Sequence, residues 1–152
     1  MKIKHHNLSK AEIANKFFHI LNAAQPAPEK RMTDREIQML SAFVTLPPKF
    51  DYYRFSDVAK AKVQKQLLED GWKVSRPSMN AKVYSLIEKE ILWRDEDRVV
   101  YVSKYILTVL RKIFEAIELD KPFNVCFEFY NEPLTQEDFN GTESISSTDT
   151  GL

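Results

Sequence analysis

Apolar residues recur every three or four positions along five stretches of the chain, which is the spacing of a helix with one buried face. Two of these stretches follow a capping-box sequence, in which Glu12 stands three residues after Ser9 and Glu36 three residues after Thr33. Gly71 stops the third helix, because glycine readily adopts the left-handed backbone that ends helices. The predicted helices extend from residue 9 to the prolines of 25–28, and then over 33–46, 57–70, 76–90 and 104–118.

Two other stretches have the pattern of strands. Residues 91–102 form two short runs joined by three acids, so we expect a hairpin, although no glycine supplies its turn. Residues 123–129 alternate, and their apolar face is made by Phe123, Val125, Phe127 and Phe129. This strand either completes the sheet of its own domain or adds to a neighbouring subunit, and the pattern leaves both alternatives open. Residues 140–152 have nothing to bury and are expected to be disordered when free.

The elements together predict a mainly α (α+β) fold. Because the QPAP segment at 25–28 separates the first helix from the second, we expect the first helix to be an arm outside the core domain. The predicted parts are an N-terminal helical arm, a central domain, a C-terminal arm made of a helix and a strand, and a polar tail. Their ranges are 1–28, 29–105, 106–139 and 140–152.

The most specific pattern is VSRPSMNAKVYSLIEKEIL at 74–92, in which Ser75 caps a helix that has Pro77 in its first turn. With the helices and the hairpin around it, this stretch resembles the winged helix-turn-helix superfamily, and MTDREIQMLSAFVTL before it looks like the opening helix of the same unit. That superfamily buries its turn and recognition helix at the positions of Val74, Met79, Val83 and Leu86, and its wing begins at Ile91 and Leu92. The chain also looks similar to the small winged-helix proteins of tailed bacteriophages, including crAss-like phages.

Winged-helix proteins commonly bind DNA, and the resemblance implies that function unless the exposed residues oppose it. The exposed face of the predicted recognition helix carries Pro77, Ala81, Tyr84, Ser85 and Glu88, with Asn80 at its edge. A reader of the major groove needs Arg or Lys for guanine and Asn or Gln for adenine, surrounded by cations for phosphate. This face has no cation at its centre and Glu88 repels phosphate, so its composition is closer to that of a protein interface.

Two sets of candidate residues follow from these alternatives. For a protein interface, we predict the exposed face of the recognition helix and the apolar face of the C-terminal strand: Pro77, Ala81, Tyr84, Glu88, Phe123, Val125, Phe127 and Phe129. For binding of DNA, we predict a second set of residues: Ser75, Arg76, Ser78, Asn80, Lys82, Arg94 and Arg98. A dimer would double each of these contacts.

Charge is unevenly distributed along the 152 residues, although the net charge is zero. Residues 1–50 carry a net charge of +4, residues 51–105 carry +2 and residues 106–152 carry −6. A basic front and an acidic tail could steer self-association or docking onto partners of opposite charge. The net charge of +2 over residues 51–105 is small beside the roughly six to ten phosphate contacts of firm DNA binding.

Residue types that carry catalysis or hold metals are sparse. The chain has three histidines (His5, His6 and His19), one cysteine (Cys126) and three glycines, without ligand spacing, a catalytic arrangement or a phosphate-cradling loop. The longest apolar runs are far shorter than a membrane span. We therefore expect a non-enzyme with no cofactor, no metal, no membrane contact and no small-molecule substrate.

These patterns favour a bacteriophage structural or assembly protein, in the head–tail connector region, that acts through protein–protein contacts. Its partners would be other virion proteins and copies of itself, and its location the virion after synthesis in the bacterial host cytoplasm. The alternative is a small sequence-specific transcriptional regulator, located in the cytoplasm, that binds double-stranded DNA.

Overall fold

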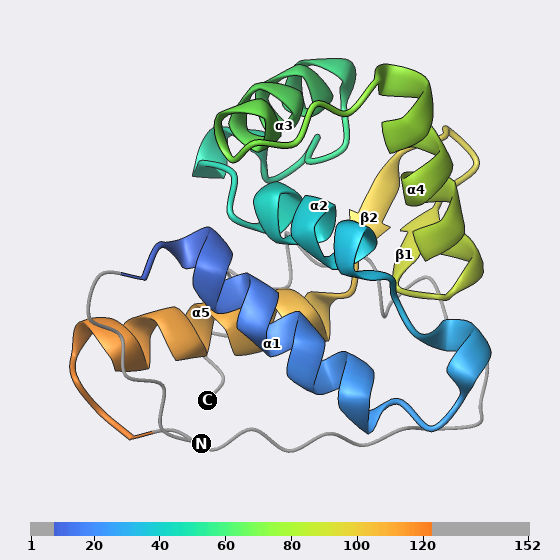
Figure 1. Cartoon of the computed structure of the whole chain (residues 1–152). Coiled ribbons are helices and arrows are strands. Elements are labelled where there is room, and N and C mark those ends of the chain that lie inside the picture. Colours follow the sequence, from blue (N-terminus) through green and yellow to red (C-terminus); the bar gives the residue numbers. More distant parts are fainter. Residues whose placement is uncertain (1–7, 123–152) are drawn as a thin grey trace.

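The computed structural model describes residues 8–122. Within this range the chain is mainly helical, with a small two-stranded antiparallel sheet (Figure 1), which agrees with the expected class of mainly α or α+β. The elements are α1 (Lys10–Ala24), η1 (Pro28–Lys30), α2 (Asp34–Val44), η2 (Pro48–Phe50), α3 (Asp57–Glu69), α4 (Arg76–Glu88), β1 (Leu92–Arg94), β2 (Val100–Val102) and α5 (Lys104–Glu118). The predicted strand at 123–129 and the predicted tail at 140–152 lie outside the described residues.

Helix α2 lies at the centre of the fold and contacts α1, α3 and α4. Its N-terminus has the predicted capping box: the Thr33 hydroxyl accepts from the Glu36 amide, and the Glu36 carboxylate accepts from the Thr33 amide. The side chains of Ile37, Leu40 and Phe43 are fully buried. Helix α2 lies between the two layers seen in Figure 1, with α3 and α4 above it and α1 and α5 below. It is buried on nearly all sides because both layers pack against it.

Helix α1 packs against α2 rather than extending away from the core. Ser9 caps it by accepting from the Glu12 amide at 3.2 Å. Its inner face buries Ile13, Ala14, Phe17 and Phe18 in the same hydrophobic cluster as α2, and it also contacts α5. This packing differs from that of the detached arm we expected, because the apolar stripe of α1 is covered by the central helix. The boundary between residues 28 and 29 stays a prediction.

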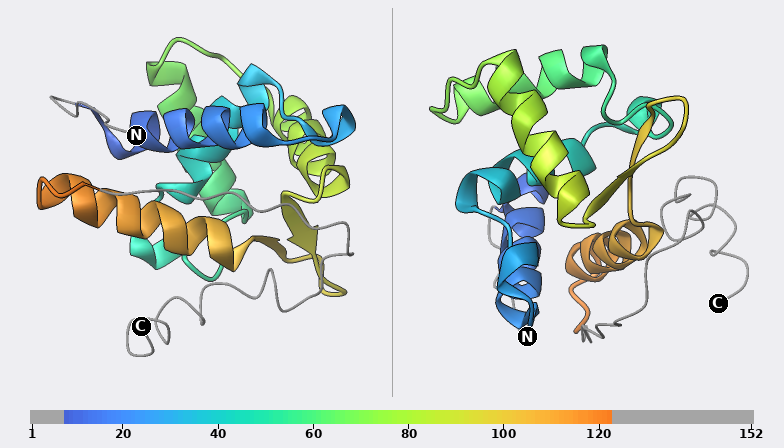
Figure 2. Two further views of the ribbon diagram at one scale, coloured as in Figure 1. Left: turned by 90° about the horizontal axis from the view of Figure 1, so that it is seen from below. Right: turned by 90° about the vertical axis from the view of Figure 1, so that its right-hand side faces the viewer.

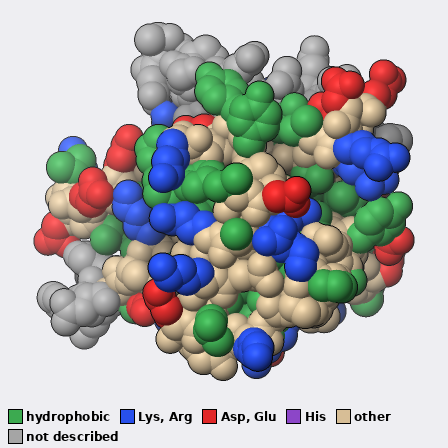
Figure 3. All heavy atoms as spheres, turned by 90° about the horizontal axis from the view of Figure 1, so that it is seen from above, with side chains coloured by type: hydrophobic (Ala, Val, Ile, Leu, Met, Phe, Trp, Pro, Cys, Tyr) green, Lys and Arg blue, Asp and Glu red, His purple; other side chains and the backbone are tan. Residues whose placement is uncertain are grey.

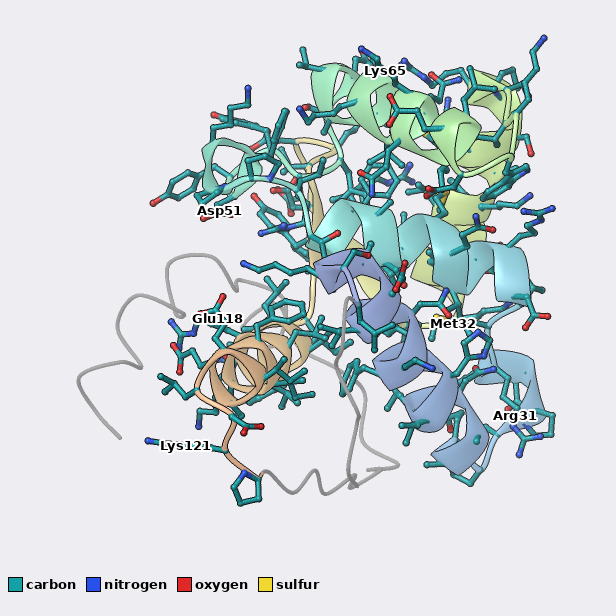
Figure 4. All side chains as sticks on the ribbon, turned by 60° about the vertical axis from the view of Figure 1, so that its left-hand side comes forward. Arg31, Met32, Asp51, Lys65, Glu118 and Lys121 are labelled. Carbon is teal, nitrogen blue, oxygen red and sulfur yellow. The ribbon has the colours of Figure 1, made fainter. Side chains whose placement is uncertain are left out.

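The connection between α1 and α2 is fastened back onto α1. Asn22 donates its side-chain amide to the Met32 carbonyl at 3.0 Å, and its side-chain oxygen accepts from the Met32 amide at 2.6 Å. The Arg31 guanidinium donates to the Gln25 carbonyl at 2.9 Å. Figure 4 shows Arg31 and Met32 at this end of the molecule. The proline-containing segment therefore acts as a tight turn between two packed helices.

The hairpin has the predicted position and a turn made without glycine. Leu92 pairs with Val102, Trp93 with Tyr101 and Arg94 with Val100. Arg98 takes the left-handed conformation, with φ 64°, and the Asp95 side chain accepts from the Val99 amide at 2.9 Å. The hydrogen bond of Asp95 therefore stabilises the turn and compensates for the backbone strain at Arg98, where a glycine would be unstrained.

Helix α5 occupies the predicted residues and follows β2 after the single residue Ser103. Leu107, Leu110 and Ile113 are buried, which agrees with the predicted stripe. The further views in Figure 2 show α5 lying beside α1, and residues of the two helices are in contact. The order of elements from α2 to β2 is three helices followed by a hairpin, as expected for the central domain.

Candidate functional site

The exposed side of α4 and the adjoining hairpin form the candidate site. Ser75 caps α4 by accepting from the Ser78 amide at 3.2 Å. Met79, Val83 and Leu86 are buried at 0%, 5% and 0% relative exposure, so the helix has the predicted rotational phase. The predicted interface residues of the opposite face, Pro77, Ala81, Tyr84 and Glu88, are all exposed, as is Asn80 at the edge. We call the surface made by these five residues and Arg94 the α4 face.

Arg94 of the hairpin contributes to this face by covering the Tyr84 ring. The centre of its guanidinium lies 5.1 Å from the ring centroid, within the range of a cation–π contact. Tyr84 remains 51% exposed. Arg94 can reach α4 because it alternates with Trp93 along β1 and shares the side of Leu92, which is buried in the core. The hairpin and α4 therefore present one surface that combines an aromatic ring with a cation.

Two of the other three predicted DNA-binding cations, Arg76 and Lys82, also have partners inside the chain. The Arg76 guanidinium donates to Gln64 Oε1 at 3.1 Å and lies 3.5 Å from Asp57 Oδ1. The Lys82 ammonium donates to Ser78 Oγ at 3.3 Å and lies 5.8 Å from the Trp72 ring centroid. A phosphate would have to compete with each of these contacts.

The predicted DNA-binding residues therefore divide into separate groups. Ser75, Arg76, Ser78 and Lys82 belong to the N-terminal half of α4, Asn80 is exposed there, Arg94 lies over Tyr84, and Arg98 forms the hairpin turn. The predicted interface residues Phe123, Val125, Phe127 and Phe129 lie outside the described residues. Among residues 8–122, the structure thus places the predicted interface residues of α4 on one exposed surface.

A network of polar residues fixes α4 against α3. Asp57 lies in the first turn of α3, and Gln64 lies two turns further along the same face. The Gln64 amide donates to the Val74 carbonyl at 3.0 Å, and its side-chain oxygen accepts from Arg76. The pKa of Lys60 lies below its ordinary value, chiefly because of burial. The nearby Asp57 opposes this shift, and the positive charge of Arg76 adds to it. Arg76 therefore serves to join the two helices.

A buried ion pair between α2 and α4 was missed by the sequence analysis. The Lys89 ammonium donates to the Glu36 carboxylate, whose side chain is 3% exposed. Burial raises the pKa of Glu36, but the hydrogen bonds from Lys89 and from the Thr33 backbone outweigh burial and hold the pKa below its ordinary value. The capping box identified Glu36, but no local pattern links it to a residue 53 positions away.

A second buried cation fixes the end of α2. Arg54 is 7% exposed, and its guanidinium donates to the carbonyls of Phe43 and Val44, each at 3.3 Å, and to Asp51 at 3.0 Å. These carbonyls belong to the C-terminal turn of α2, where the helix dipole favours a cation. Burial lowers the pKa of Arg54, and Asp51 opposes this shift. Arg54 was not identified by the sequence analysis.

The Tyr101 hydroxyl lies at the outer side of the hairpin and donates to Asp95 Oδ2 at 3.2 Å. Burial and the neighbouring carboxylates of Asp95 and Asp97 raise the pKa of this hydroxyl. The Trp93 ring stacks on Tyr101 with a centroid separation of 6.2 Å. These contacts stiffen the hairpin that carries Arg94.

An open cavity of about 690 Å³ lies between α1, α2 and the end of α3. Its lining mixes apolar residues with polar ones such as Glu12, Lys16, Gln38 and Gln66. None of the predicted interface or DNA-binding residues lines it. Among residues 8–122 there is also no group of three or more His, Cys, Asp and Glu side chains placed to hold a metal ion.

No protein-family model, curated protein or solved structure matches this chain. In the part of the chain that the structure describes, no helix is both long enough and apolar enough to cross a membrane.

Proposed function

We propose that this chain is a non-enzymatic protein that acts through protein–protein contacts, and that the α4 face is one of its contact surfaces. The stacking of Arg94 on Tyr84 carries this proposal. Arg94 covers the Tyr84 ring and so forms part of an aromatic surface. Tyr and Arg are enriched where proteins bind one another. Pro77 and Ala81 extend the surface with small apolar side chains that are exposed.

The order of elements from α2 to β2 supports assigning residues 29–105 to the winged helix-turn-helix superfamily. The sequence also looks like that of small winged-helix proteins of tailed bacteriophages, and on this resemblance we further propose that the chain is a structural or assembly protein of a virion, in the head–tail connector region. Its partners in this role are other virion proteins and copies of itself.

A second candidate function is sequence-specific DNA binding. The exposure of Asn80 favours it, because an asparagine side chain can bind adenine in the major groove. Figure 3, the view onto α3 and α4, also shows many Lys and Arg side chains on this side of the molecule. Against it stand the exposed Glu88 and the internal partners of Arg76 and Lys82.

Fluorescence anisotropy with labelled duplexes separates the two functions. At a salt concentration of about 150 mM, the proposed function predicts only weak binding that does not depend on sequence, with a dissociation constant of roughly 1 µM or higher. Submicromolar binding to a defined duplex would contradict it, provided that Asn80→Ala and Arg76→Ala each weaken the binding. Glu88→Lys is the matched control for the face, since it replaces repulsion by attraction and strengthens binding if DNA lies there.

A further inference from the structure

Trp72 is the centre of a second surface, distinct from the α4 face. This half-buried indole lies between α3 and α4, with the Arg35 guanidinium 4.6 Å from its ring centroid and the Lys82 ammonium 5.8 Å away. Lys73, the next residue in the chain, is exposed. We call Arg35, Trp72, Lys73 and Lys82 the Trp72 patch.

The cations of this patch have no carboxylate partner among residues 8–122. Within the described residues, no Asp or Glu oxygen lies within 4.0 Å of Arg35, Lys73 or Lys82, whereas Lys30, Arg54, Arg76 and Lys89 each have such a partner. Arg35 donates instead to Gln38 Oε1 at 2.9 Å, and Lys82 to a serine hydroxyl. Two cations held against one indole repel each other, and a bound anion would reduce that repulsion.

The chain itself supplies a segment of opposite charge. Residues 123–152 contain six Asp and Glu and no Lys or Arg, whereas residues 1–122 contain all 22 Lys and Arg and 16 Asp and Glu. Two of those acids, Glu137 and Asp138, are followed at once by Phe139. This order of two carboxylates and an aromatic ring complements two cations beside an indole, because carboxylates pair with the cations and aromatic rings stack.

The position of α5 favours a neighbouring copy as the source of this segment. Lys121, close to the last described residue, lies on the α5 side of the molecule, whereas Lys65 of α3 lies on the opposite side, with α2 between the two layers (Figure 4). The Trp72 patch belongs to the α3 and α4 side. The last described residues of the chain and the Trp72 patch therefore lie on opposite sides of α2.

We propose that residues 132–139 of one copy dock onto the Trp72 patch of a second copy. This inference rests on the proposed function, since it names one of the protein contacts of an assembly protein, but different residues carry it. A contact between two unlike surfaces leads to closed rings or to longer chains, unless two copies exchange their segments.

Sedimentation velocity of the full-length chain over a range of concentrations tests the proposal. We expect concentration-dependent association at about 50 mM salt that weakens at about 500 mM, because higher salt screens exposed charges. The double substitution Arg35→Glu with Lys82→Glu should weaken association at least tenfold. The control, Lys62→Glu with Lys65→Glu, changes the net charge equally at exposed positions of α3 and should weaken it much less.

Reversing both sides of the contact makes the test specific. Glu137→Lys with Asp138→Lys should weaken association as the patch substitution does, and all four substitutions together should restore it. Thermal melting of each variant checks that the fold is kept. Restored association would support the proposal in a way that a mere loss of folding could not imitate.

Three results would overturn the proposal. One is a chain that stays monomeric at all concentrations, or one whose association ignores the patch substitutions. A second is a monomer in which Trp72 fluorescence, read in a Trp93→Phe background, shifts on Glu137→Lys with Asp138→Lys, because the segment would then occupy its own patch. The third is tight duplex DNA binding that only the patch substitutions abolish. None of these depends on Asn80, so failure here is distinguishable from failure of the proposed function.

Discussion

The Lys89 ammonium donates to the Glu36 carboxylate in the interior between α2 and α4. The Glu36 carboxylate also accepts a hydrogen bond from the Thr33 amide, so one carboxylate both caps α2 and joins it to the end of α4. Removing one partner would leave the other charge buried without its counterpart. The ion pair therefore positions the helix that carries the α4 face.

Lys89→Met should lower the free energy of unfolding by about 2–3 kcal/mol, because a buried carboxylate loses its charged partner. We place the loss below that of a fully buried pair, since the Lys89 side chain is 17% exposed. Adding Glu36→Leu should recover part of the loss, because no unpaired charge remains. Urea denaturation of the two variants measures this, and a double variant less stable than Lys89→Met would contradict it.

The same carboxylate should make stability depend on acid. The folded-state pKa of Glu36 lies below its ordinary value of 4.5, so near that pH the unfolded chain binds more protons than the folded one. The stabilisation is therefore complete above about pH 5 and is lost as the pH falls through the folded-state pKa. Thermal melts from about pH 6 to pH 3 should show a shallower loss in Glu36→Gln than in the natural chain.

The orientation of α4 predicts unequal costs for two substitutions in it. Leu86→Ala should destabilise the chain by about 2–5 kcal/mol, because a fully buried leucine leaves a cavity. Tyr84→Ala should cost less than about 1 kcal/mol, because Tyr84 is 51% exposed. Equal costs in denaturant titrations would mean that Tyr84 supports the core as much as Leu86 does.

Arg54→Met should destabilise the chain by about 2–3 kcal/mol, since two buried carbonyls and the half-buried Asp51 carboxylate lose a charged donor. Arg54→Lys should fall between the natural chain and Arg54→Met, because an ammonium keeps the charge without the planar fork. Lys62→Met is the control at an exposed position and should change stability by less than about 0.5 kcal/mol. A thermal melt in which Arg54→Met matches this control would refute the capping role.

Two left-handed residues should respond in opposite directions. Gly71 has φ 92° and a Cβ there would meet no atom within 4 Å, so Gly71→Ala should cost about 1–2 kcal/mol through backbone strain alone. Arg98→Gly relieves the strain at φ 64° and should leave stability unchanged or raise it by up to about 1 kcal/mol. A destabilising Arg98→Gly would show that its side chain holds the hairpin.

Local patterns were sufficient for the elements, because caps and apolar spacing act over a few residues. Thr33 and Gly71 delimited helices correctly, and Met79 and Leu86 gave the rotational phase of α4. Contacts between distant residues could not be read in the same way. The partners of Arg94 and Arg76 depend on how the hairpin and α3 meet α4, so the sequence showed cations but not whether they were engaged.

The packing of α1 shows the same limit. A segment with two prolines suggested a detached arm, whereas Asn22 and Met32 close that segment into a turn that returns the chain to the core. The apolar spacing of this helix, with Ile13, Phe17, Ile20 and Leu21, already required a covering surface, but the sequence did not say that α2 would provide it.

The central claim is that this chain acts through protein contacts of the α4 face as part of a virion. Quantitative mass spectrometry of purified virions of the proposed parent phage tests this claim most directly, with the natural chain compared with an Ala81→Glu, Tyr84→Ala variant of unchanged thermal stability. The account predicts that the natural chain is a fixed component of the particles and that the variant is largely lost from them. A chain that is made in infected cells but is absent from purified virions would contradict the account.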